Sequence, residues 1–393
     1  MKAVTWQGKK TMAVEEVPDP RIEHPTDAVI KVTSTGLCGS DLHLYDPLSP
    51  FMSPGDIVGH EAMGIVEEVG SEVTAIAPGD RVVVPFNISC GGCWMCDQGL
   101  FSQCETTQNT EHGTGASLFG YSKLYGQVPG GQAELLRVPF ANVMPIKVPH
   151  GPPDDRFVFL SDVLPTAWQA VEYAGVGADQ TLLVLGAGPI GDMAARIALR
   201  RGRRVMVVDP VPERLARVAA YGAEALGDDT PAAVVTAVRD ATSGRGADAV
   251  IDAVGMEAHG SPFAESVAKF VGLLPDAVSE PLMRSAGVDR LAALHLALDA
   301  VRRGGTVSVS GVYGGAMDPL PMMEMFDKQI QLRMGQANVL RWSDDILALL
   351  LEDEDVLGVE SFATHHLPLD AAPDAYRDFR SKADGMVKVV FQP

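Results

Sequence analysis

The chain lacks three features that would indicate a membrane or a polyanion as its partner. It has no apolar run of about 18 residues or more, the length needed to cross a bilayer. Its N-terminus, MKAVTWQGKK, has no apolar stretch of the kind found in signal peptides. Only 31 Lys and Arg residues stand against 51 Asp and Glu, so the net charge of −20 would repel nucleic acids and anionic lipids. We expect a cytoplasmic protein with no nucleic-acid partner and no membrane partner.

Cysteines are also few, and they are unevenly spread. Cys38 stands alone, whereas the other four lie in the segment CGGCWMCDQGLFSQC, as Cys90, Cys93, Cys96 and Cys104. Without a secretion signal, such crowding is typical of metal binding rather than of a disulfide framework. Four thiolates on a short glycine-rich loop can surround one tetrahedral zinc and leave no open position. We predict a structural zinc in a lobe at about 87–106, with an iron–sulfur cluster as the alternative.

The length of 393 residues favours two domains, because single hydrophobic cores stop growing at about 250–300 residues. The part up to about Pro85 contains short Val- and Ile-rich runs, punctuated by Gly, Pro and Asp. This pattern predicts a small β-barrel or β-sandwich. From residue 181 onward, apolar runs alternate with amphipathic segments, which predicts βα units around a parallel sheet.

The segment TGLCGSDLH, from Thr35 to His43, carries four kinds of reactive side chain within one short stretch. Cys38, Ser40, Asp41 and His43 supply a thiol, a hydroxyl, a carboxylate and an imidazole. On its own, the cysteine could be a nucleophile, a metal ligand or neither.

The segment PGDIVGHEAMGIVEE places His60 and Glu61 at the entry to an expected strand. Gly59, just before them, would allow the close approach of another segment. A His beside a Glu is otherwise most often a surface pair. Both interpretations stay open from these residues alone.

Two segments follow the cysteine lobe. Residues 105–128 are polar and rich in glycine, and they predict a long surface loop. Residues 157–175 have helical apolar spacing. Asp162 would cap this helix at its N-terminus, and Pro165 in the first turn agrees with that interpretation.

The segment TLLVLGAGPIGDMAARIALRRGRRVMVVD predicts a dinucleotide-binding unit of strand, glycine-rich turn, helix and strand. Gly186 would make the tight turn, Gly188 would let the backbone reach the pyrophosphate, and Gly191 would let the helix pack on the strand. Pro189 and Ile190 complete the turn and open the helix.

Asp209 follows the second strand of this unit, where a carboxylate binds the adenosine ribose of NAD and repels the phosphate of NADP. The cofactor is therefore expected to be NAD. The nearby Arg214 is the one residue that would favour NADP.

The alternation continues beyond Asp209. Residues 256–289 are too long for an ordinary crossover and are interpreted as an insertion. The remaining expected elements are helices at 212–221, 232–242, 290–303 and 344–352, and strands at 247–255, 306–312 and 386–393.

GLCGSDLH, GHE, the four-cysteine lobe and GAGPIG followed by an acid together resemble the zinc-dependent medium-chain dehydrogenase/reductase superfamily. The resemblance implies an α/β chain with a GroES-like β-barrel catalytic domain, residues 1–163 and 336–393. A doubly wound Rossmann domain, residues 164–335, would lie between these two parts of the sequence.

The resemblance also implies roles for the site residues. Cys38 and His60 would bind a catalytic zinc, and Asp162 stands where the commonest members have a further cysteine. Its carboxylate would keep the charge of the lost thiolate. Two zinc ions and one NAD per chain are expected.

Further roles concern the surroundings of that zinc. Ser40 would pass the alcohol proton through the cofactor ribose to His43. Asp41 would accept from the second nitrogen of His60. The remaining roles belong to Glu61, which would approach the zinc or pair with Lys388, and to Lys388 and Thr166, which would contact the cofactor.

Asp162, the insertion and GGQAE make the chain resemble the glutathione-independent formaldehyde dehydrogenase branch. In that branch the insertion covers the adenosine end of NAD, which would slow NAD release and favour aldehyde dismutation. The substrate would be a small alcohol or aldehyde, and the protein a homodimer or homotetramer. The alternatives are a general primary or secondary alcohol dehydrogenase, a polyol dehydrogenase, and a non-catalytic NAD-binding redox sensor.

Overall fold

The computed structural model describes residues 1–227, 230–255, 291–313 and 320–393. These residues form two compact units, Met1–Pro165 with Ala337–Pro393, and Thr166–Gln336. The boundaries expected from sequence, at 163/164 and 335/336, fall close to these. The expected insertion, 256–289, lies outside the described residues.

The first unit is built mainly from antiparallel strands. Its strands are β1 (Lys2–Gly8), β2 (Thr11–Glu16), β3 (Ala28–Leu37), β4 (Asp56–Ile57), β5 (Glu61–Val69), β6 (Arg81–Val84), β7 (Gln108–Asn109), β8 (Thr114–Ala116), β9 (Leu135–Val138), β10 (Ile146–Lys147), β17 (His365–Pro368) and β18 (Val389–Gln392). Its α-helices are α1 (Asp41–Tyr45), α2 (Trp94–Asp97), α11 (Val339–Leu350) and α12 (Ala372–Ser381), and short 3₁₀ turns include η2 (Phe101–Gln103) and η6 (Val158–Ser161).

Strand β3 is the centre of this unit. It pairs antiparallel with β5, β9 and β18 in a sheet of order β10-β6-β5-β3-β18-β17. The pairing of Val389 with Leu37 and of Val390 with Gly36 brings the C-terminal tail beside the segment that ends in Cys38. The two terminal parts of the chain therefore belong to one compact unit. Buried Val, Ile and Ala side chains of β3, β5, β6 and β9 form its core.

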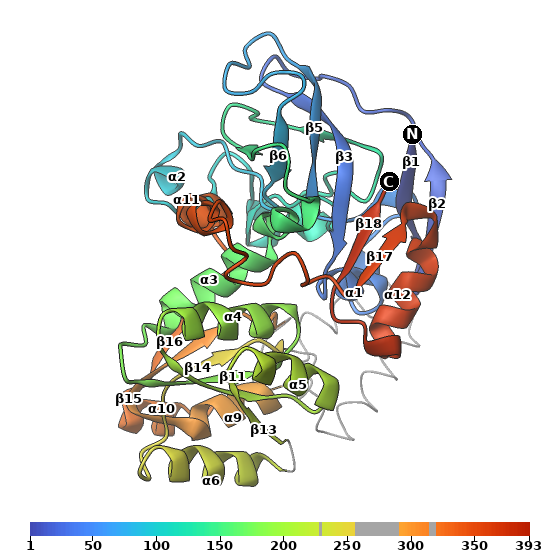
Figure 1. Ribbon diagram of the computed structural model, residues 1–393. Coiled ribbons are helices and arrows are strands. Elements are labelled where there is room, and N and C mark those ends of the chain that lie inside the picture. Colours follow the sequence, from blue (N-terminus) through green and yellow to red (C-terminus); the bar gives the residue numbers. More distant parts are fainter. Residues whose placement is uncertain (228–229, 256–290, 314–319) are drawn as a thin grey trace. The chain divides into compact units, whose positions relative to one another are not determined.

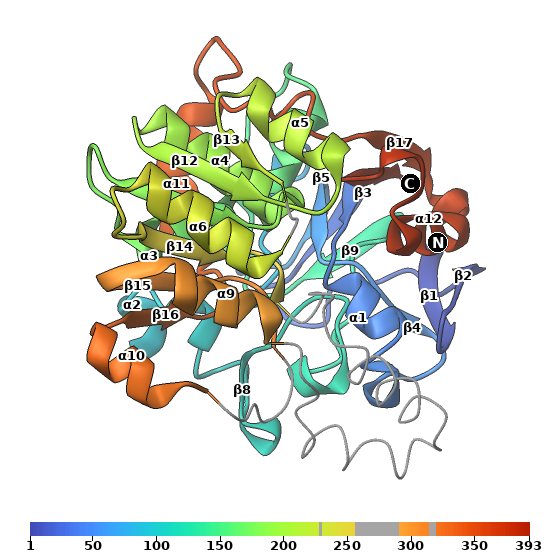
Figure 2. The same cartoon turned by 90° about the horizontal axis from the view of Figure 1, so that it is seen from below.

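Helix α12 covers another part of the same unit. Figures 1 and 2 show it beside β1 and β2, with both ends of the chain nearby. Its buried face includes Tyr376 and Phe379.

The second unit is a parallel sheet of order β13-β12-β11-β14-β15-β16. Figure 1 shows α4 and α5 on one face of this sheet and α6 and α9 on the other. Its strands are β11 (Thr181–Leu185), β12 (Arg204–Val208), β13 (Glu224–Leu226), β14 (Ala247–Asp252), β15 (Val301–Val309) and β16 (Gln331–Met334), and its helices are α4 (Pro189–Arg200), α5 (Pro212–Ala220), α6 (Pro231–Ala241), α9 (Ala292–Ala300) and α10 (Met322–Lys328). Helix α3 (Val163–Ala174) contains the boundary between the units.

This strand order is that of a doubly wound fold, and the predicted α/β class is confirmed. The order reverses between β11 and β14. Ligands of such sheets bind at the carboxyl ends of the strands beside this switch point.

Two expectations about local structure were wrong. The helix expected at 290–303 ends at Ala300 as α9, because Val301 begins strand β15 and pairs with Ala247. The segment 105–128 is not simply a surface loop. Its Phe119 is 1% exposed and belongs to the core of the first unit, and Leu118 forms a β-bridge to Asn87.

None of the helices described in the structure is both long enough and apolar enough to cross a membrane.

Candidate functional site

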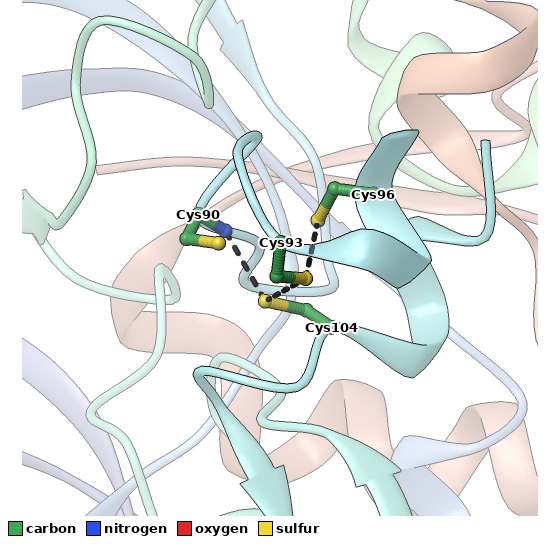
Figure 3. A group of neighbouring side chains, drawn as sticks. All are labelled: Cys90, Cys93, Cys96 and Cys104. Atoms are coloured by element: carbon green, nitrogen blue, oxygen red, sulfur yellow. Dashed lines mark hydrogen bonds between the residues drawn. The ribbon is translucent and has the colours of Figure 1, made fainter. Parts of the chain in front are cut away.

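The four crowded cysteines converge on one point in the first unit. Their sulfur atoms all lie within 4.8 Å of one another, and Figure 3 shows them facing a common centre. The Sγ atom of Cys93 lies 3.5 Å from that of Cys96 and 3.9 Å from that of Cys104. Four sulfurs at about 2.3 Å from a tetrahedral zinc would lie about 3.8 Å apart. The geometry therefore fits a zinc ion with four thiolate ligands.

Backbone N–H groups already point at these sulfurs. The N–H of Cys90 donates to Cys104 at 3.3 Å, and the N–H of Glu105 donates to Cys93 at 3.4 Å. Such donors stabilise thiolates. They indicate that the lobe is organised for negatively charged sulfur.

The lobe is attached to the C-terminal part of the first unit, a contact that sequence reasoning missed. Ser102 donates to the side-chain oxygen of Asn338 from both its N–H and its hydroxyl, each at 2.9 Å. Asn338 directly precedes α11, which lies beside α2 in Figure 1. No spacing in the sequence signals this partner.

A second group forms where β3 ends, where β5 begins and where η6 meets α3. The ligand-type atoms of Cys38, His60, Glu61 and Asp162 all lie within 4.8 Å of one another. One oxygen of Asp162 lies 3.4 Å from Cys38 Sγ and 3.4 Å from His60 Nε2. Asp162 stands where a helix cap belongs, directly before α3, but this oxygen faces the cluster.

This second cluster also fits a metal ion, because the negative charge of its buried carboxylates would be balanced by a bound cation. Burial lowers the pKa of His60, but the nearby carboxylates of Asp41 and Asp162 outweigh that effect and raise it overall. Burial, together with the charge of Asp162, raises the pKa of Cys38 to about 11. The cluster thus retains protons at the positions where a divalent cation would place positive charge.

Glu61 is the fourth member of the cluster, and it has a partner of its own. Its carboxylate lies 2.5 Å from the ammonium of Lys388, and both side chains are fully buried. Lys388 also donates to the Leu37 carbonyl at 3.1 Å. This placement favours the predicted ion pair with Glu61 over the predicted contact of Lys388 with the cofactor. It also excludes the interpretation of His60 and Glu61 as a surface pair.

The remaining side chains of TGLCGSDLH surround the cluster. Ser40 Oγ lies 3.3 Å from both Cys38 Sγ and His60 Nε2. One oxygen of Asp41 lies 3.1 Å from His60 Nδ1, the place predicted for a carboxylate that fixes this ring. His43 lies in α1 and is only 7% exposed, so it is not a solvated loop residue.

Aromatic residues that sequence reasoning missed line the same place. The rings of Phe86 and Tyr121 meet the His60 ring edge-on, with centroids 6.1 and 6.4 Å away. Tyr121 lies in the segment expected to be a surface loop and is 8% exposed. The segment 105–128 is rich in glycine and polar residues, and for that reason its few buried apolar side chains were not predicted.

The glycine-rich segment of the second unit has the geometry of a phosphate-binding turn. Gly186 adopts φ +90°, and a Cβ on Gly191 would lie 1.8 Å from the Gly186 carbonyl oxygen. Gly188 directly precedes α4, and Pro189 and Ile190 form the first turn of this helix. The helix N-terminus is therefore available to an anionic group.

Asp209 lies at the end of β12 and organises this turn. Its two oxygens accept from the N–H of Ala187 at 2.7 Å and from the N–H of Val211 at 2.8 Å. Arg214 approaches the carboxylate to 3.9 Å. Thr166, the other expected cofactor contact, lies on α3 and is half-buried.

Two protein-family models match this chain. Residues 24–148 match the alcohol dehydrogenase GroES-like domain, and residues 189–270 match the zinc-binding dehydrogenase family. The zinc-type alcohol dehydrogenase-like protein AdhB of Bacillus subtilis is 40% identical over 100% of both chains. The chain belongs to the zinc-type alcohol dehydrogenase family. The predicted family, fold class and use of zinc are thereby confirmed.

This chain is also similar in sequence and in structure to other members of the family. Formaldehyde dismutase of Pseudomonas putida is 32% identical, over 96% of this chain and 94% of its own length. The solved structure of the alcohol dehydrogenase TADH from Thermus sp. ATN1 superposes with a TM-score of 0.83, at 35% identity over 100% of this chain and 99% of that one. The chain is thus an oxidoreductase of the zinc-type alcohol dehydrogenase kind.

Proposed function

We propose that this protein transfers a hydride between NAD and a small alcohol or aldehyde, with formaldehyde among its substrates. The observation that carries the proposal is the cluster of Cys38, His60 and Asp162, three donors suited to zinc around one buried point. Three protein ligands leave a position for substrate, as in catalytic rather than structural zinc sites.

The third protein ligand in this proposal is Asp162 rather than Glu61. Asp162 already places one oxygen at equal distance from Cys38 and His60, 3.4 Å from each. Glu61 is held by Lys388, and that ion pair keeps its carboxylate from closing the open position. Zinc held there would polarise the substrate oxygen as a Lewis acid.

The alcohol that is oxidised loses its hydride to the nicotinamide and its hydroxyl proton to water. Ser40 Oγ, 3.3 Å from two of the metal-binding atoms, is placed to accept that proton first. His43, one helical turn further along the chain, is proposed as the next group to accept it.

NAD is the proposed cofactor because Asp209 would meet the adenosine ribose beside the glycine-rich turn. A carboxylate there accepts from a ribose hydroxyl and repels a phosphate. The guanidinium of Arg214 lies 3.9 Å from the Asp209 carboxylate, and this contact competes with binding of the ribose 2′-phosphate of NADP. Gly188 would face the pyrophosphate, and Thr166 would pack against the nicotinamide.

The aromatic edges of Phe86 and Tyr121 favour a small substrate over a polyol. They present apolar surface beside His60, where a chain of hydroxyl groups would lose hydrogen bonds to water. Similarity to a formaldehyde dismutase supports the same choice. In dismutation, one aldehyde and one water molecule give the acid, and the hydride released reduces a second aldehyde to the alcohol.

We also propose a homo-oligomer, a dimer or a tetramer, in a reducing compartment such as the cytoplasm. Four large apolar side chains on α10 and on the edge strand β16 are more than half exposed, namely Met322, Met323, Phe326 and Met334. A second copy of the chain would cover them. All five cysteines are free, in keeping with thiols reserved for metals. Light scattering on the purified protein would contradict the oligomer if it gave the mass of one chain.

The proposed function is tested with the zinc-loaded protein and a panel of primary alcohols, secondary alcohols, polyols and formaldehyde. NADH formation is followed by absorbance, and methanol and formate are measured after incubation with formaldehyde alone. We expect turnover of small substrates. Equal amounts of methanol and formate without added NAD would indicate dismutation by a retained cofactor.

The outcomes separate the alternatives. Turnover of polyols above all other substrates would favour a polyol dehydrogenase, and broad turnover of larger alcohols would favour a general alcohol dehydrogenase. Binding of both zinc and NAD without any turnover would favour a redox sensor. Loss of all nucleotide on dialysis would contradict slow release of NAD.

A further inference from the structure

A chain of buried polar side chains runs from helix α12 to the metal-binding His60. Tyr376 donates its hydroxyl to Gln132 Oε1 at 2.9 Å. Gln132 Nε2 donates to Asp41 Oδ2 at 3.4 Å, and Asp41 Oδ1 lies 3.1 Å from His60 Nδ1. Tyr376, Gln132 and Asp41 are all 0% exposed. Water therefore does not replace any of these contacts.

The direction of each hydrogen bond follows from the groups around the Gln132 amide. Its nitrogen also faces the Gly36 carbonyl oxygen at 3.2 Å, which can only accept. The NH₂ group must therefore point toward Gly36 and Asp41. The amide oxygen is left facing Tyr376, whose hydroxyl must donate.

Two observations support this direction. Burial and the nearby Asp41 raise the pKa of Tyr376, so its hydroxyl keeps the proton that it donates. The N–H of Cys38 also donates to Asp41 Oδ2, at 3.0 Å. Asp41 thus receives two donors on one oxygen and presents the other oxygen to His60.

The consequence for His60 is a defined ring orientation and tautomer. An acceptor at Nδ1 favours the proton on that nitrogen, which leaves the lone pair of Nε2 for the metal. Nε2 is the nitrogen that faces Asp162 and Ser40.

The backbone around Gln132 is equally well determined. Its N–H donates to the Val58 carbonyl at 3.0 Å, and its own carbonyl accepts from the N–H of Val4 at 2.8 Å. A Cβ on Gly59 would lie 2.3 Å from the Gln132 side chain, so only glycine permits this approach directly before His60. The predicted close approach at Gly59 is confirmed, and the approaching segment is the one that carries Gln132.

We propose that Gln132 and Tyr376 are positioning residues for the catalytic metal, because they fix the Asp41 carboxylate that orients His60. The inference rests on the proposed function, since it requires a metal at Cys38, His60 and Asp162. The proposal gives α12 a role in the site, because this helix carries Tyr376, the outermost donor in the series of contacts that ends at His60. Tyr376 lies 316 positions after His60 in the sequence.

The test compares the full-length, zinc-loaded protein with the variants Gln132→Met, Tyr376→Phe and Tyr45→Phe. Methionine fills a similar volume but cannot donate to Asp41. Tyr45→Phe is the matched control. Tyr45 is also buried, its ring centroid lies 5.7 Å from that of Tyr376, and it lies outside the series of hydrogen bonds described above. Zinc is withdrawn with chelators of increasing strength, and the zinc of the four-cysteine lobe serves as an internal reference.

We expect Gln132→Met to weaken the catalytic zinc site about 10-fold, as losses around metal-binding histidines do. Tyr376→Phe should weaken it about 3-fold, since it removes one neutral hydrogen bond. Tyr45→Phe and the lobe zinc should not change. With cobalt in the catalytic site, the visible absorption bands should shift in Gln132→Met and keep their position in Tyr45→Phe.

Equal retention of the catalytic metal and equal cobalt spectra in all four proteins would overturn the proposal. If Gln132→Met does not fold, Tyr376→Phe decides alone, and an unchanged affinity in that variant is then sufficient to reject it. A wild-type protein that binds zinc only in the lobe would instead reject the proposed function. The two failures are thereby distinguished.

Discussion

The cysteine lobe and the Cys38 cluster both fit zinc, but they are assembled over very different stretches of sequence. The outermost lobe thiols, Cys90 and Cys104, are 14 positions apart. Cys38 and Asp162 are 124 positions apart within the segment Met1–Pro165 of their domain. A short loop can position its own ligands, whereas the second cluster depends on the folding of the whole sheet.

The two sites also differ in the charge that they hold without a metal. Burial raises the pKa of Cys104, but hydrogen bonds from Cys90 and Thr107 outweigh it and lower the pKa to about 6. Burial raises the pKa of Cys38 to about 11. The lobe thus has a thiolate ready at neutral pH, while Cys38 keeps its proton until a cation displaces it.

This difference agrees with the tasks proposed for the two sites. A structural site benefits from ligands that favour the metal before it arrives. A catalytic site benefits from surroundings that orient ligands and leave one position open. Backbone donors serve the first purpose, and the side chains of Asp41, Gln132 and Tyr376 serve the second.

The largest expected effect follows from removing a ligand of the second cluster. Cys38→Ser should lower kcat by about 10³-fold or more, because the Lewis acid supplies several kcal/mol of stabilisation. Steady-state assays and metal analysis check this, with about one zinc per chain expected to remain in the lobe. NAD binding, measured by fluorescence, should persist. Full activity of the variant would refute the catalytic assignment of Cys38.

Asp162 supplies a matched pair of variants for the same measurement. Asp162→Cys introduces the third ligand of the commonest family members and should retain zinc in the catalytic site. Asp162→Ala should lose it. If both variants keep the metal equally well, Glu61 must complete the ligand set in place of Asp162.

A smaller effect, on stability rather than on chemistry, is expected when the lobe loses a ligand. Cys104→Ser should release the lobe zinc and lower Tm by about 5 °C or more, because binding of a structural zinc contributes directly to folding. Differential scanning calorimetry and metal analysis check this. Ser102→Ala, which keeps all four thiols, should retain both zinc ions. An unchanged Tm in Cys104→Ser would contradict a structural role.

A smaller effect than the loss of the catalytic metal should come from the nucleotide unit, where a short motif again positions its own group. Asp209→Ala should raise KM for NAD about 10-fold, the loss expected for a hydrogen bond to a charged group. The preference for NAD over NADP should fall as well. Glu213→Ala removes an exposed acid on α5 and should leave both values unchanged. An unchanged KM in Asp209→Ala would remove the argument for NAD.

Sequence reasoning identified those parts of the site whose chemistry lies in short segments. The four lobe cysteines converge on one point, Gly186 lies in the tight turn before α4 and Gly191 in the first turn of that helix, and Asp209 contacts the tight turn through the N–H of Ala187. Each depends on turns and strands that a few neighbouring residues specify. Asp41 beside His60 was also predicted, but through family resemblance rather than from spacing.

Contacts between distant segments were not predictable in the same way. Phe86, Tyr121 and Tyr376 carry no signal in their local sequence, because an aromatic ring can pack in any core. Gln132 stands in the segment GGQAE, but nothing in that segment shows that its side chain contacts Asp41 and Tyr376. The strand at Val301 was missed for a related reason, since its pairing with Ala247 ended the helix early. Tertiary partners outweigh local preference at such places.

The segment TGLCGSDLH illustrates both limits. Its residue types, together with His60, the four-cysteine lobe and GAGPIG, were enough to indicate a zinc-dependent dehydrogenase. They left open whether Glu61 approaches the zinc or pairs with Lys388, which directly precedes the last strand, and they did not show that Tyr376 and Gln132 lie behind Asp41. The identity of a ligand is a property of one residue, whereas its orientation depends on buried hydrogen bonds that form only when distant segments pack together.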